Sequence, residues 1–73
     1  MNSLPSISGR ACVRALQDAG FRLVRRESSH MILRRDEPFA QVVVPDHRQL
    51  DRGTLRAIIR QSGLSVTEFT KLL

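Results

Sequence analysis

The sequence predicts one α+β domain, a two-layer sandwich in which two helices cover one face of a three-stranded antiparallel sheet. The 73-residue chain has room for one small core, so residues 1–73 are taken as a single domain. Apolar residues recur at helical spacing near both ends of the chain and with a period of two between them. Short connections join the three central segments, which favours antiparallel pairing of neighbours.

The first helix is expected over residues 11–19, after a short mobile lead-in at residues 1–5. Its apolar side chains share one arc, and Ser6 or Ser8 can cap its N-terminus. Cys12 lies on the apolar arc with no charged partner suggested nearby. We therefore interpret Cys12 as a core residue rather than a nucleophile.

In the central third of the chain, apolar and polar residues alternate with the period of two that is typical of strands. Strands are expected over the ranges 21–27, 30–35 and 39–44. Alternation places Leu23 and Arg25 on one face of the first strand. It also places His30 on the same face of the second strand as Ile32 and Arg34.

Two further helices are expected after the sheet. Asp51 is placed to cap a helix over residues 52–62, and Ser65 with Glu68 has the spacing of a capping box that opens a short last helix. The resulting order, αβββα with a short C-terminal helix, is that of the double-stranded-RNA-binding domain. This likeness of topology does not by itself establish a function.

The charge balance favours a polyanionic partner. The net charge is +5, and eleven of the twelve basic residues are Arg, with Lys71 as the exception. Arginine can hold a phosphate through two hydrogen bonds, although a GC-rich genome would also enrich it. Trp and Tyr are absent, so a module that stacks successive bases on aromatic rings is not expected.

The counts of Cys and His and the lack of a long apolar run exclude further classes of protein. A single Cys cannot form an internal disulfide, and with two His it cannot complete a structural zinc site, so no metal is expected. The sequence has no apolar run that could span a membrane and no secretory signal pattern. A cytoplasmic protein without a membrane partner is therefore the expectation.

His30 is the candidate with the most direct chemistry. A neutral imidazole exchanges protons near neutral pH. RNA cleavage without a metal needs a base to deprotonate the 2′-hydroxyl that attacks the phosphate, and an acid to protonate the leaving 5′-oxygen. Guanidinium groups can stabilise the charge that develops on the phosphate. A strand-edge histidine without a role is the alternative for His30, and a loop-orienting role is the alternative for His47.

A stripe of arginines is predicted on the second long helix. Arg52, Arg56 and Arg60 recur every four residues, and no acidic residue lies four positions away to neutralise them. Such a stripe would bind a phosphate backbone in a salt-dependent way. A solvated helix face is the alternative interpretation.

The sequence resembles the HicA (YcfA-like) family of small toxins from toxin–antitoxin systems. The resemblance covers nearly the whole chain in order and spacing. Its motifs are Ala19-Gly20-Phe21, Ser29-His30, Val42-Val43-Val44-Pro45 followed by His47, and the stretch Leu50 to Leu64. The family's histidine motif is Gly-Ser-His, and this chain has Ser28 in place of the glycine.

The resemblance implies a double-stranded-RNA-binding-like fold, a cofactor-independent endoribonuclease that cleaves mRNA, and a HicB-like antitoxin as partner. It makes His30 the catalytic histidine. Ser29, His47, an arginine or a water could supply the second catalytic group. Charge and position, rather than the resemblance, suggest that RNA contacts Arg25, Arg26 and Arg34 of the hairpin and the helix stripe.

Two other functions fit the same charge and fold. A non-catalytic RNA-binding module would bind RNA in a salt-dependent way without cutting it. An interaction protein would use its basic face to dock an acidic partner.

Overall fold

The elements of the protein follow the predicted order. The computed structural model describes residues 4–73. The elements are α1 (Gly9–Asp18), β1 (Arg22–Glu27), β2 (His30–Asp36), β3 (Phe39–Pro45), α2 (Arg52–Ser62) and α3 (Val66–Thr70). The three strands form one antiparallel sheet with β2 in the centre. The chain therefore has the αβββα order of the predicted two-layer sandwich.

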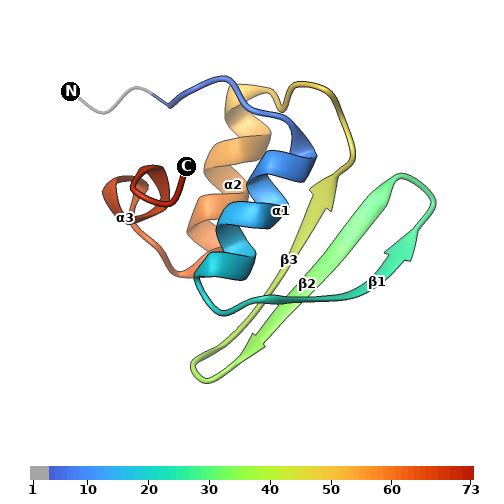
Figure 1. The fold of residues 1–73 in the computed structure, drawn as a ribbon, viewed down its shortest axis with the longest axis vertical. Coiled ribbons are helices and arrows are strands. Elements are labelled where there is room, and N and C mark those ends of the chain that lie inside the picture. Colours follow the sequence, from blue (N-terminus) through green and yellow to red (C-terminus); the bar gives the residue numbers. More distant parts are fainter. Residues whose placement is uncertain (1–3) are drawn as a thin grey trace.

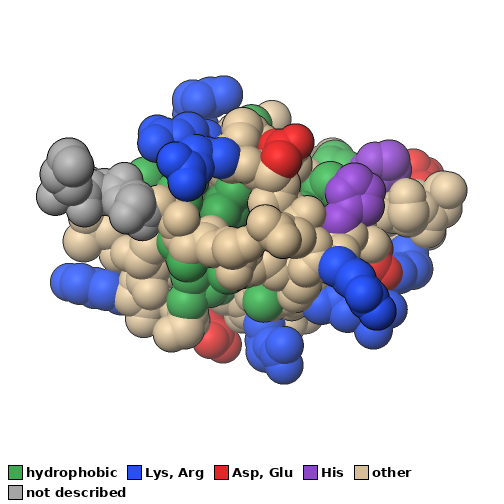
Figure 2. Space-filling view, turned by 90° about the horizontal axis from the view of Figure 1, so that it is seen from above, with side chains coloured by type: hydrophobic (Ala, Val, Ile, Leu, Met, Phe, Trp, Pro, Cys, Tyr) green, Lys and Arg blue, Asp and Glu red, His purple; other side chains and the backbone are tan. Residues whose placement is uncertain are grey.

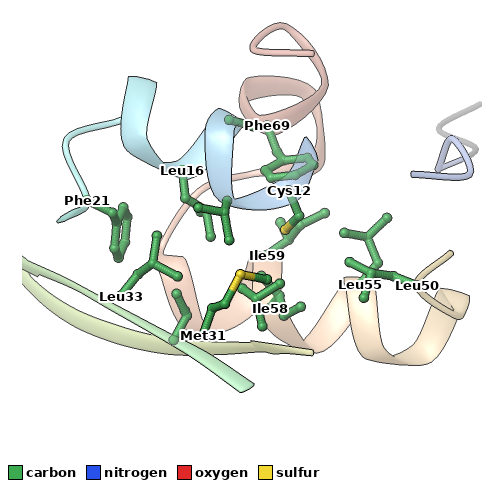
Figure 3. Packing of buried hydrophobic residues seen from close by; sticks show 14 of the residues in the cluster. Cys12, Leu16, Phe21, Met31, Leu33, Leu50, Leu55, Ile58, Ile59 and Phe69 are labelled. Atoms are coloured by element: carbon green, nitrogen blue, oxygen red, sulfur yellow. The ribbon is translucent and has the colours of Figure 1, made fainter. Parts of the chain in front are cut away.

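The helices cover one face of the sheet. Figure 1 shows α1 and α2 side by side across that face, with α3 on the side of the helical layer away from the strands. The core lies between the layers, where Leu16 of α1, Leu33 of β2 and Ile58 of α2 meet (Figure 3). Phe69 of α3 is fully buried in the same cluster. Among residues 4–73, no helix lies over the opposite face of the sheet (Figure 1).

The capping residues predicted from the sequence are the ones that begin the helices. The Ser8 hydroxyl accepts from the Ala11 N–H at 3.0 Å, and the Asp51 carboxylate accepts from the Thr54 N–H at 2.6 Å. Ser65 and Glu68 form both hydrogen bonds of the capping box. These caps fix where each helix starts relative to the loop before it.

Two details differ from the expectation. Leu4 is buried against the core, so the mobile lead-in predicted over residues 1–5 is wrong at this position, and residues 1–3 lie outside the described part of the chain. A β-bulge in β1 lies between Leu23 and Arg25. The bulge adds a residue to one strand, so these two side chains lie on opposite faces rather than on one.

The start of α1 lies directly against the end of β3. A Cβ atom on Gly9 would come within 2.0 Å of the Pro45 carbonyl oxygen. The Gly9 N–H donates to the carbonyl of His47 at 2.9 Å. Only a residue without a side chain permits this approach, which holds the loop after β3 against the helix.

Candidate functional site

His30 lies at one end of the sheet, where three segments meet. It begins β2, and its Cα partners are Glu27 in β1 and Pro45 in β3. One residue beyond Pro45, the Asp46 N–H donates to the Ser29 carbonyl at 2.7 Å. The β1–β2 turn and the loop after β3 are thus hydrogen-bonded to each other next to an exposed histidine.

The strand register divides the arginines of the hairpin between the two faces of the sheet. Met31 and Leu33 point into the core, so His30 faces away from the helices. Arg25 is opposite Ile32 and shares the face of His30, whereas Arg26 is opposite Met31 on the helical side. The Arg25 Nε donates to Glu27 at 2.8 Å in a pair whose side chains are both exposed, and exposed pairs of this kind exchange partners readily.

Arg26 is held by Asp46. The Asp46 carboxylate accepts from Arg26 Nη2 and, at 3.2 and 3.3 Å, from Nε and Nη2 of Arg10. Its side chain is only 16% exposed. The hydrogen bonds from Arg10 and Arg26 lower the pKa of Asp46 below its usual range, so the carboxylate stays charged at neutral pH. The pairing of Arg10 with Asp46 could not be predicted from the sequence, because the two residues are 36 positions apart and no local pattern marks them.

We expect stability to fall in acid, through the carboxylates of Asp36, Asp46 and Asp51. Each has a pKa below its ordinary value in the folded chain, owing to Arg22 at Asp36, Arg10 at Asp46 and the Thr54 N–H at Asp51. The unfolded chain therefore binds more protons near pH 4, so the free energy of unfolding is highest above that pH and falls as pH drops from about 5. Urea unfolding at a series of pH values measures the free energy of unfolding across this range. A free energy that does not change with pH would contradict the stabilising role of these carboxylates.

Arg34 is on the same face as His30 but not beside it. The two residues are four positions apart along β2, which corresponds to about 13 Å. Its Nε lies 3.8 Å from Asp36, which also accepts from Arg22 at 2.8 Å. Arg34 belongs with this ion-pair group along the strand rather than with the histidine.

His47 shares the end of the sheet with His30. It comes two residues after Pro45, its carbonyl accepts from Gly9, and its side chain is exposed. Figure 2 shows the histidine side chains gathered at one end of the molecule, with Lys and Arg side chains next to them. The structure therefore brings together His30, Ser29, His47 and Arg25.

Ser28 has the backbone conformation that the resemblance to Gly-Ser-His suggests. Its φ is 57°, and no other non-glycine residue among 4–73 has a positive φ. Two-residue hairpin turns of the primed types need a positive φ at the first central position, which is why glycine is favoured there. Ser28 adopts that angle at a conformational cost.

We expect Ser28→Gly to stabilise the protein by about 0.5–1 kcal/mol. An L-residue at positive φ costs about 1–2 kcal/mol, and the greater entropy that glycine loses on folding offsets part of the gain. Ser29→Gly is the matched control, because Ser29 has no positive φ and its replacement should destabilise slightly. Chemical unfolding of both variants checks this, and equal effects would rule out strain at Ser28.

The arginine stripe of α2 is present and exposed. Arg52, Arg56 and Arg60 form no ion pair with any side chain in the described range 4–73. Arg52 and Arg60 lie eight residues apart, about 12 Å along the helix. The stripe begins just after the loop that carries His47 and runs away from it.

Among the residues that the structure describes, the other reactive groups are not gathered into a site. Burial raises the pKa of the Cys12 thiol to about 12, which keeps it protonated and agrees with its place in the core. Within residues 4–73, no three His, Cys, Asp or Glu side chains cluster in a way that could hold a metal ion. In the same range, every helix is too short or too polar to cross a bilayer.

Comparison with protein families relates the chain to known proteins. A family model described as "HicA toxin of bacterial toxin-antitoxin" matches residues 9–64, from the start of α1 to just beyond α2. The matched range contains His30, His47 and the arginine stripe. A search of curated proteins finds no match.

Proposed function

The chain belongs to the HicA toxin family of bacterial toxin-antitoxin systems, and from this premise we propose that it is an endoribonuclease that cleaves mRNA. The family makes the protein a toxin with an antitoxin partner. The cleavage reaction, the substrate and the catalytic role of His30 are our proposal. The proposed place of action is the cytoplasm, where mRNA is found.

One observation carries the proposal. An exposed histidine lies at a hairpin end that is hydrogen-bonded to the loop bearing the second histidine. In the proposed reaction, one group removes the proton of a 2′-hydroxyl, the 2′-oxygen attacks the adjacent phosphorus, and a second group protonates the departing 5′-oxygen. Proton transfer of this kind is most efficient with groups whose pKa lies near neutrality, as that of an ordinary imidazole does.

His47 is the best-placed second group for this reaction. It lies two residues beyond the strand partner of His30, and its side chain is exposed at the same end of the molecule. The Ser29 hydroxyl and a water are the other candidates. Arg25 is on the face of His30 and can exchange Glu27 for a phosphate oxygen, which would stabilise the charge of the transition state.

The flanking RNA backbone is proposed to bind the stripe on α2. Arg52, Arg56 and Arg60 are exposed and without carboxylate partners in the part of the chain that the structure describes. A phosphate can therefore bind these arginines without first displacing a carboxylate. Arg26 is held by a shielded carboxylate and Arg34 is far from His30, so neither is as well suited as the sequence suggested.

A HicB-like protein is the proposed antitoxin. A chain of net charge +5 attracts an acidic partner, and covering His30 together with the neighbouring arginines would block both cleavage and RNA binding.

Expression from a tightly controlled promoter tests the proposed function. The wild-type chain should arrest growth and deplete mRNA, and His30→Ala, produced at the same level, should do neither. If both proteins deplete mRNA equally, the role of His30 is wrong. If neither does, the protein is not an mRNA-cleaving toxin, and the non-catalytic RNA-binding module becomes the better description.

A further inference from the structure

We propose that Asp46 is a positioning residue for RNA cleavage, which sets His30 and His47 relative to each other by tying the β1–β2 turn, β1 and α1 to the loop after β3. The inference rests on the proposed function. It comes from a carboxylate whose contacts converge at the end of the sheet where both histidines lie. The family match does not assign this residue a role.

The contacts of Asp46 reach the turn before His30, β1 and α1. Its backbone N–H donates to the carbonyl of Ser29, in the turn directly before His30. Its carboxylate accepts from Arg26 in β1 and from Arg10 in the first turn of α1. The two flanking residues matter as well, because Pro45 is the strand partner of His30 and the carbonyl of His47 accepts from Gly9. A single residue therefore joins the turn, β1, α1 and the loop.

The charge of Asp46 holds β1 and α1 to the loop, and its backbone N–H holds the turn. Both carboxylate oxygens accept hydrogen bonds, Oδ1 from Arg10 and Oδ2 from Arg10 and Arg26. An asparagine offers one acceptor oxygen and turns an N–H donor towards the other guanidinium. Two positive side chains would then face each other with no anion between them, and the loop would lose its fixed place.

The chain offers a matched control in Asp36. Its carboxylate also pairs with two arginines, Arg22 at 2.8 Å and Arg34 at 3.8 Å. It lies at the far end of β2 from His30. Asp36→Asn therefore makes the same change of charge and breaks an ion-pair group of the same size. Any effect of net charge on RNA affinity is common to both variants.

The test is the cleavage kinetics of the purified full chain. We expect Asp46→Asn to lower kcat by about 10- to 100-fold, because misplaced catalytic groups slow the chemical step rather than binding. KM should change equally in Asp46→Asn and Asp36→Asn, and Asp36→Asn should keep kcat within about 2-fold of wild type. Equal kcat values for the two variants would overturn the proposal.

Hydrogen exchange of the residue 46 amide separates this inference from the proposed function. Exchange should be faster in Asp46→Asn than in wild type and unchanged in Asp36→Asn, because the hydrogen bond to the Ser29 carbonyl opens more often when the carboxylate no longer anchors the loop. If wild type fails to cleave RNA, the proposed function falls, while exchange still decides whether the carboxylate holds the loop. Unchanged exchange at residue 46 in Asp46→Asn would overturn the inference whatever the kinetics.

Discussion

Replacing His30 by alanine is expected to slow RNA cleavage by about 10²–10⁴-fold, the usual contribution of one general acid or base. His30 is exposed at the start of β2, and its side chain makes no hydrogen bond or ion pair within residues 4–73, so the fold should survive. The substitution removes the proton-transferring group and leaves the arginines of α2 in place. RNA affinity should therefore stay close to that of wild type while kcat falls.

Single-turnover cleavage with parallel binding measurements checks this result. His47→Ala is the informative companion, since it makes the same substitution at the other histidine. If His47 is the second group, the pH profile of kcat loses one of its two limbs in this variant. A His30→Ala protein that is folded, binds RNA and retains wild-type kcat would show that His30 is not catalytic.

The largest effect on stability is expected for Gly9→Ala. The new Cβ would meet the Pro45 carbonyl oxygen at 2.0 Å and the Pro45 carbonyl carbon at 3.1 Å. Both atoms belong to the backbone, so α1 must move away from the end of β3. We expect a loss of about 1–3 kcal/mol, the usual range for overpacking, and a fall in Tm on the order of 10 °C.

Gly53→Ala is the matched control for this prediction. Gly53 lies in the first turn of α2, where a Cβ would meet only the Asp51 carboxylate oxygen at an ordinary 3.8 Å. Alanine favours the helix and restricts the unfolded chain, so this variant should gain about 0.4–1 kcal/mol. Thermal and urea unfolding of both variants measure the difference. A Gly9→Ala protein as stable as wild type would mean that α1 is not held against β3.

The sequence was sufficient for features that depend on local patterns. The element order follows from periodicity, and the caps Ser8, Asp51 and Ser65 follow from side chains that accept hydrogen bonds from N–H groups three residues ahead. The positive φ of Ser28 agrees with the glycine that the family motif has at this position. In each case the cause lies within a few residues of the effect.

Features that depend on contacts distant in sequence could not be predicted. The bulge in β1 is set by pairing with β2, and it places Leu23 and Arg25 on opposite faces of the sheet instead of on one. The pairing of Asp46 with Arg10 and Arg26 forms only when the sheet brings the loop, β1 and α1 together. Charge alone grouped Arg25, Arg26 and Arg34 near His30, whereas the register separates them by face and by distance along the strand.

The central claim is that this chain cuts RNA through proton transfer at the 2′-hydroxyl. The most direct measurement incubates the purified protein in EDTA with an RNA and with the same sequence methylated at every 2′-oxygen. We predict that the unmodified RNA is cut to fragments ending in 2′,3′-cyclic phosphate and that the methylated RNA is bound and left whole. Binding of unmodified RNA without cleavage, or equal cleavage of both RNAs, would contradict the account.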